Sequence, residues 1–203
     1  MIRSLSIQNF KSIKKTSFGC KKLNVFIGEP NSGKSNILEA LALKSQNAVN
    51  DHLNKEIFRY KTLGDLFFDF DINTPILVET DFDALKLEYA AKDKVPENKF
   101  NLYPKAQLNV PESPIKIEHD GKIAQHGRLF DTNIKFYEYK RLKEFKANYF
   151  PHLTVPFGDN LPGLLLSNSQ LKKWVTEFLL AKGLTLTLKP TENDLSVSKF
   201  KDQ

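Results

Sequence analysis

The chain has 203 residues, of which 40% are hydrophobic and 27% charged, with a net charge of +6. This composition is ordinary for a globular protein and excludes a chain that is disordered throughout. No apolar run approaches the roughly 18 residues that a membrane-spanning helix needs, and the first residues lack the apolar stretch of a secretion signal. The one cysteine, Cys20, excludes an internal disulfide, so we expect a cytoplasmic protein with no membrane partner.

The positive charge is concentrated at the N-terminus. The first 22 residues contain no acidic side chain, and the rest of the chain carries 24 basic and 24 acidic residues. The basic side chains at the start are Arg3, Lys11, Lys14, Lys15, Lys21 and Lys22. Such a patch favours the phosphates of a nucleotide or of nucleic acid. The alternative is that the lysines protect the exposed edge of a strand from pairing with other chains.

Residues 28–35 read GEPNSGKS, which fits the phosphate-binding P-loop pattern G-x-x-x-x-G-K-[ST]. The preceding residues 23–27, LNVFI, predict a short buried strand. Residues 35–44 predict a helix with an apolar stripe formed by Ile37, Leu38, Leu41 and Ala42. The motif therefore lies between a strand and a helix, as its mechanism requires.

The residue types of this loop suit a bound triphosphate and its magnesium ion. Gly28 and Gly33 permit a tight backbone path, so that successive N–H groups can face an anion at the helix N-terminus. Lys34 can reach the β- and γ-phosphates, and the Ser35 hydroxyl can bind Mg²⁺. We therefore predict ATP and Mg²⁺ as cofactors, Lys34 as the catalytic residue and Ser35 as the metal ligand. The predicted cofactor-binding residues are Gly28, Glu29, Pro30, Asn31, Ser32, Gly33, Lys34, Ser35, Asn36 and Lys11.

The flanks of the loop resemble the opening of the RecF/SMC/OLD group of ABC-type ATPases. The resemblance covers about the first 45 residues and rests on the tag Asn9-Phe10-Lys11-Ser12 between two strands, and on Asn36-Ile37 and LEAL in the helix. Many members have asparagine where this chain has Pro30, which removes one N–H donor, so the donors must begin at Asn31. The resemblance implies an α/β P-loop fold, the first lobe of an ATPase head with a mixed sheet and β-hairpin insertions. It also implies a head-to-head dimer, with DNA and a nuclease domain or subunit as further partners.

The sequence of the middle of the chain predicts a hydrophobic core and two β-hairpins. Residues 47–71 are aromatic-rich and predict core, and residues 75–91 predict a β-hairpin. Residues 91–114 contain four prolines and predict a loop or variable insertion. Residues 115–125 predict a hairpin with a type I′ turn at Asp120-Gly121.

The last part predicts a turn that enters an apolar segment, followed by a helix and two strands. In residues 153–166, Gly158, Asp159 and Asn160 are interpreted either as close to the nucleotide or as a helix cap. Residues 169–182 predict a helix with Trp174 in the core, followed by a strand over 184–188 and a final short strand. We thus expect residues 1–203 to form a single lobe.

The parts of an ATPase that cleave the nucleotide are not apparent. Hydrolysis needs a carboxylate pair after an apolar strand, and only residues 76–79, ILVE, weakly imitate one. No LSGGQ-like signature occurs, and the four histidines show no metal-ligand spacing. We therefore predict nucleotide binding without efficient turnover, with hydrolysis depending on a further lobe. The alternatives are a self-contained small phosphotransferase, a nucleic-acid-binding module with a basic N-terminal sheet, and a remnant that folds but does little.

Overall fold

The computed structural model describes residues 1–45, 52–92, 95–103, 114–123, 134–147 and 150–199. The chain divides into two compact units, Met1–Phe136 and Tyr137–Gln203, where the sequence predicted a single lobe. Each unit is described by itself. Among the helices in the described ranges, none is long and apolar enough to cross a membrane.

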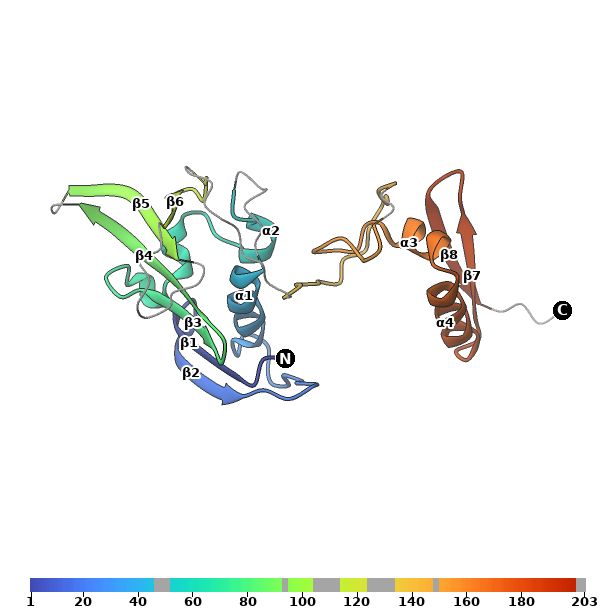
Figure 1. The fold of residues 1–203 in the computed structure, drawn as a ribbon, viewed down its shortest axis with the longest axis horizontal. Coiled ribbons are helices and arrows are strands. Elements are labelled where there is room, and N and C mark those ends of the chain that lie inside the picture. The colour runs from blue at the N-terminus through green and yellow to red at the C-terminus, as the bar shows by residue number, and fades with distance from the viewer. Residues whose placement is uncertain (46–51, 93–94, 104–113, 124–133, 148–149, 200–203) are drawn as a thin grey trace. The chain divides into compact units, whose positions relative to one another are not determined.

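The first unit is built on a six-stranded sheet with the strand order β2-β1-β3-β4-β5-β6, and every pairing between its strands is antiparallel (Figure 1). Its strands are β1 (Ser4–Phe10), β2 (Ile13–Gly19), β3 (Ile76–Thr80), β4 (Ala84–Lys92), β5 (Val95–Tyr103) and β6 (Ile115–Glu118). The other elements are α1 (Lys34–Lys44), α2 (Lys55–Phe58), and the 3₁₀ turns η1 (Leu63–Leu66) and η2 (Phe68–Phe70). The two predicted N-terminal strands and the predicted helix after the P-loop are confirmed.

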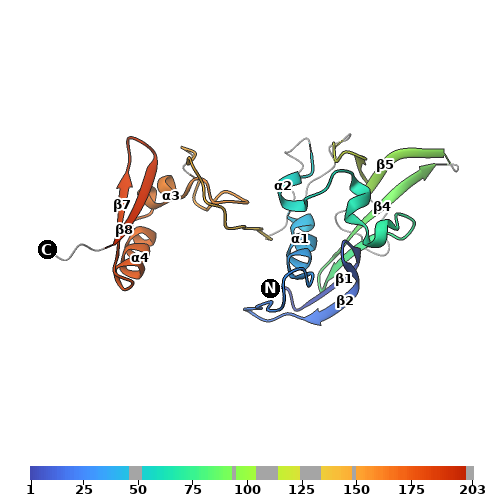
Figure 2. The ribbon, with the colours of Figure 1, turned by 180° about the vertical axis from the view of Figure 1, so that it is seen from behind.

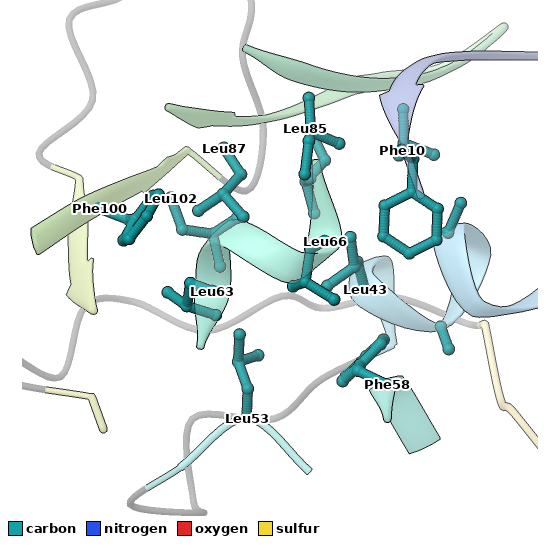
Figure 3. Close-up of a cluster of buried hydrophobic side chains, with 14 of the residues drawn as sticks. Phe10, Leu43, Leu53, Phe58, Leu63, Leu66, Leu85, Leu87, Phe100 and Leu102 are labelled. Carbon is teal, nitrogen blue, oxygen red and sulfur yellow. The ribbon is translucent and has the colours of Figure 1, made fainter. Parts of the chain in front are cut away.

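One face of this sheet packs against the helices. On β1, Leu5 and Ile7 are buried while Ser6 and Gln8 are half-exposed, the alternation of a strand with one covered face. Figure 3 shows apolar side chains of the strands meeting those of α1, α2 and η1. The core residues labelled there are Phe10, Leu43, Leu53, Phe58, Leu63, Leu66, Leu85, Leu87, Phe100 and Leu102. The prediction of a core in the aromatic stretch is confirmed for Phe58 and Phe67, which are buried, and is wrong for Phe70, which is 72% exposed.

Both predicted hairpins are present, with differences at their ends. Strands β3 and β4 form the first, but β5 then occupies residues that we predicted as a loop. The prolines misled the prediction, since Pro96 lies at the start of β5, where a missing N–H is tolerated. In the second hairpin the Gly121 N–H donates to Glu118 O at 2.8 Å, and only Gly121 of the predicted pair has a positive φ, so the turn is not type I′. Residues 124 and 125 of that prediction lie outside the described ranges.

The predicted strand before the P-loop is wrong for this structure. Residues 23–27 belong to no strand, and Leu23, Val25 and Ile27 are 78%, 69% and 90% exposed. Their apolar character is that of a buried strand, but no described strand pairs with them. The half-buried Phe26 ring meets Phe18 of β2 edge to face at 5.7 Å.

The second unit contains two helices and a hairpin (Figures 1 and 2). These elements are α3 (Leu161–Ser167), α4 (Ser169–Leu180), β7 (Leu184–Lys189) and β8 (Asp194–Lys199), and β7 pairs antiparallel with β8. The predicted helix and final strands are confirmed. The prediction of a core tryptophan is wrong, because Trp174 is 59% exposed on α4.

Gly121 is a position where a side chain is expected to damage the first unit. Its φ is +91°, and a Cβ there would lie 1.9 Å from the Tyr60 hydroxyl, which donates to Leu53 O at 2.8 Å. Burial, helped by the charge of Asp120, raises the pKa of Tyr60 to about 12 and keeps that donor protonated. We expect Gly121→Ala to lower the free energy of unfolding by about 2–3 kcal/mol, measured by urea denaturation.

A glycine in the same unit offers a matched control for this substitution. A Cβ at Gly64 would meet no atom closer than 3.6 Å, and its φ is not positive. Gly64→Ala should therefore change the free energy of unfolding by well under about 1 kcal/mol. Equal effects of the two substitutions would contradict the proposed clash at Gly121.

Candidate functional site

The P-loop residues form a tight turn that leads directly into α1. Asn31 and Gly33 have φ of 61° and 85°, and Gly33 is the N-cap of the helix. The first N–H groups of a helix have no partner within it, so those of α1 remain as donors for an anion. Gly33 is required twice over, since its φ is left-handed and a Cβ would lie 3.0 Å from the Ser12 hydroxyl oxygen.

Lys34 folds back over the loop. Its ammonium donates to Gly28 O at 2.9 Å, to Glu29 O at 2.6 Å and to the Ser32 hydroxyl at 3.0 Å. The positive charge is thus held at the mouth of the turn by three oxygen atoms. All three acceptors are neutral, so a negatively charged phosphate oxygen would attract the ammonium more strongly than any of them.

The remaining loop residues lie where the motif predicts. The Ser32 N–H donates to Glu29 O at 3.3 Å and closes the turn around Pro30, which contributes no donor. Ser35 lies in the first turn of α1 and is exposed. The structure therefore brings residues 28–36 together as one contiguous site.

Lys11 is placed differently. Its ammonium is bonded to the Glu39 carboxylate and to Phe58 O, and the side chain is mostly buried. The structure assigns this lysine to the contact between the β1–β2 turn and α1. A contact of Lys11 with the nucleotide stays a prediction.

Two side chains that the sequence analysis did not select lie beside this site. Ser12 accepts a hydrogen bond from the Asn36 side-chain amide at 2.7 Å, across 24 positions of sequence. Glu39 is buried on α1 and pairs with both Lys11 and Arg59. Both residues fall within segments singled out from the sequence, the tag and the helix run LEAL, but their roles depend on tertiary contacts.

Residues 158–160 belong to the second unit, and their predicted closeness to the nucleotide is not tested. Asn160 is at the N-cap position of α3, but its side chain accepts from the Thr154 N–H at 2.9 Å and does not cap the helix. Asp159 pairs with Lys146 at 2.7 Å. Partial burial alone would raise the pKa of Asp159, but the bonds from Lys146 and Thr154 lower it below the usual value.

The weak carboxylate candidate at residues 76–79 lies in an antiparallel part of the sheet. These residues belong to β3, between two antiparallel neighbours, and Glu79 is exposed. The described ranges of the chain contain no group of three or more His, Cys, Asp or Glu side chains that could hold a metal ion.

The turn, its lysine and the following helix are those of a P-loop nucleotide-binding protein. The chain belongs to the AAA ATPase domain family, which matches residues 1–181. It is also similar to a Helicobacter pylori (strain ATCC 700392 / 26695) protein named ATP/GTP phosphatase, with 36% identity over 93 residues. That match covers 41% of this chain and 25% of the relative, so the chain spans about a quarter of the relative's length. No solved structure matches the chain.

Proposed function

We propose that this chain binds Mg-ATP through residues 28–36. The observation that carries the proposal is the P-loop turn itself, in which the Lys34 ammonium lies against the loop oxygens and the chain leads directly into the N-terminus of α1. Membership of the AAA ATPase domain family supports the proposal, as does the name of the Helicobacter relative.

The chemistry of the site suits the triphosphate and its ion. We assign Lys34 to the β- and γ-phosphates. On nucleotide binding, its ammonium would leave the neutral loop oxygens and donate to phosphate oxygens. Ser35 offers an exposed hydroxyl oxygen in the first turn of α1, a ligand type that Mg²⁺ accepts while keeping several waters. Bound Mg²⁺ would neutralise phosphate charge, and the chain's own residues would hold and orient the nucleotide.

We propose further that the protein is an ABC-type ATPase of the RecF/SMC/OLD kind. The tag turn packed against α1, beside an antiparallel sheet, supports this class. A head-to-head dimer, DNA as a partner and an associated nuclease follow from the class as proposals, with work in DNA repair, chromosome maintenance or phage defence.

Hydrolysis in this proposal depends on carboxylates from a further segment of the ATPase. The exposed run 23–27 supports such a segment, because the N–H groups of residues 23–28 have no backbone hydrogen bond to another described residue. Apolar side chains on one face of an unpaired extended segment are suited to joining a sheet. We propose that strands of the further segment pair with residues 23–27 and place the carboxylates near the P-loop.

The direct test is to measure ATP binding and ATP turnover by the 203-residue chain. We expect Mg²⁺-dependent binding, weakened at least tenfold by EDTA, with turnover no faster than in a Lys34→Ala control. Turnover that requires Lys34 would contradict the need for a further segment. It would favour the self-contained phosphotransferase, with catalytic carboxylates already present in this chain.

Nucleic acid is a second candidate ligand, supported by exposed lysines at the sheet edge. Lys14 and Lys15 lie on β2, an edge strand, and Lys21 and Lys22 follow it. The same position suits lysines that only prevent edge pairing. The two interpretations predict different affinities of the chain for DNA or RNA. If these lysines neutralise phosphates, the affinity should fall steeply as the salt concentration rises. If the lysines only protect the edge, no binding should be measured at physiological salt.

A further inference from the structure

We propose that Ser12 is part of the phosphate-binding site, with its hydroxyl donating a hydrogen bond to the bound nucleotide's phosphate chain. The inference rests on the proposed function and deepens it. It adds to the P-loop a residue that lies outside the motif, in the turn between β1 and β2.

The position of the Ser12 hydroxyl carries the proposal. Its oxygen is 2.7 Å from the side-chain nitrogen of Asn36 and 3.0 Å from the point where a Cβ on Gly33 would lie. These two contacts place it between the N-cap and the third residue of α1, beside the backbone donors that face an anion.

The hydrogen bond with Asn36 also determines whether the Ser12 hydroxyl can donate or accept a further hydrogen bond. A serine hydroxyl has one proton to donate and can accept two hydrogen bonds. The Asn36 amide uses an acceptor position of Ser12, and no described residue accepts the Ser12 proton. Because Ser12 is exposed, that proton is available to a ligand oxygen.

Hydrogen bonds of two preceding residues, Asn9 and Lys11, hold the turn that carries Ser12. Asn9 has φ of 56° and is buried, and its amide donates to Asp71 O at 3.0 Å and to Thr74 O at 2.5 Å. Lys11 has φ of 49°, and its N–H donates to Leu66 O at 2.8 Å. Left-handed backbone at non-glycine residues persists where the surroundings hold it, and it is common at ligand sites.

The buried ammonium of Lys11 completes this support. It joins the turn to Glu39 on α1 and to Phe58 O, so the turn and the P-loop helix cannot separate without breaking an ion pair. Lys11 thus acts as a positioning residue for Ser12. A group held in place before binding loses little entropy when the ligand arrives, which favours affinity.

The test compares Mg-ATP affinity of the full chain and its Ser12→Ala variant by isothermal titration calorimetry. Loss of one hydrogen bond to a charged group should weaken binding by about tenfold. Ser17→Ala is the matched control, because Ser17 is an exposed serine on β2, outside the loop. The Mg-ATP affinity of the Ser17→Ala variant should be unchanged. Asn36→Ala in the Ser12→Ala background should add little, since the amide is expected to act through the hydroxyl.

The melting temperature of the nucleotide-free variants separates a ligand contact from a structural one. We expect Ser12→Ala to melt within about 2 °C of the unsubstituted chain, because Ser12 is exposed. An unchanged Mg-ATP affinity would overturn the inference, and so would a loss of affinity accompanied by a large fall in melting temperature. If Lys34→Ala abolishes binding while Ser12→Ala does not weaken it, only this inference fails. If neither substitution matters, the proposed function fails as well.

Discussion

Replacement of Lys34 by alanine is expected to reduce Mg-ATP binding by at least a hundredfold. The ammonium is the one cation that the P-loop turn holds, and its three present partners are neutral oxygen atoms of the loop. A charge-assisted bond to phosphate contributes about 1.5–3 kcal/mol, and Lys34 is expected to contact two phosphates. Each 1.4 kcal/mol corresponds to a tenfold change in affinity. Titration calorimetry or competition with a fluorescent nucleotide would measure the loss.

The control for this substitution is Lys22→Ala. Lys22 carries the same charge, is exposed, and lies in the same basic N-terminal stretch but outside the loop. It should change affinity less than about threefold, since an exposed charge at a distance is largely screened by salt. Both variants should melt close to the unsubstituted chain. Equal losses in the two variants would show that general positive charge, and not the P-loop, attracts the nucleotide.

The sequence predicted those helices and strands that a short stretch of residues is enough to identify. Helix α1 follows from periodicity and the hairpins follow from turn residues between alternating runs, whereas strands β1 and β2 were implied by the resemblance around the tag. Residues 23–27 read equally well as a strand, yet a strand is buried only where other strands pair with it. None of the described strands does so, and the apolar pattern alone could not reveal that.

Trp174 illustrates the same limit on a helix. The spacing of Leu171, Trp174, Val175 and Phe178 correctly predicted a helix over this stretch. Periodicity identifies an apolar face, but burial of that face depends on what packs against it. In the second unit, Trp174 and Phe178 stay exposed.

The residues of the candidate site also fall into those that a contiguous motif predicts and those that depend on tertiary contacts. A contiguous motif is visible in sequence, so residues 28–36 were predicted as one site and the structure brings them together. Ser12 and Glu39 join that site only because the β1–β2 turn folds over α1. A residue type in a tag cannot show which helix the tag contacts, so the ion pair of Lys11 with Glu39 could not be predicted, and the nucleotide contact of Lys11 stays a prediction.

Replacement of Glu39 by alanine is expected to have the largest effect on stability. Glu39 is 4% exposed and accepts from the Lys11 ammonium and the Arg59 guanidinium. Without it, the mostly buried Lys11 ammonium keeps two neutral partners among the described residues, Phe58 O and the Phe10 ring, whose centroid is 5.9 Å away. Removing one member of a buried pair costs about 3–5 kcal/mol, because the other charge is left without compensation. Urea denaturation would measure the change in the free energy of unfolding.

Two further variants show whether the loss comes from the unpaired charge. Glu79→Ala removes an exposed carboxylate on β3 and should cost less than about 0.5 kcal/mol. Glu39→Met combined with Lys11→Met replaces the buried pair with apolar side chains and should recover part of the stability lost in Glu39→Ala, since such replacements are often close to neutral. A double variant less stable than Glu39→Ala would show that the pair stabilises the fold by direct attraction, and not merely by mutual compensation.

The same double variant connects stability with binding. If the Lys11–Glu39 pair serves to hold the β1–β2 turn over the P-loop, then restoring stability with methionines need not restore Mg-ATP affinity. The methionines fill space but impose no fixed distance between the turn and α1, so the Ser12 hydroxyl loses its defined place. A double variant that recovers stability but binds Mg-ATP several-fold more weakly is the expected result. Full recovery of both would mean that packing alone positions Ser12 and that the buried charges have no part in it.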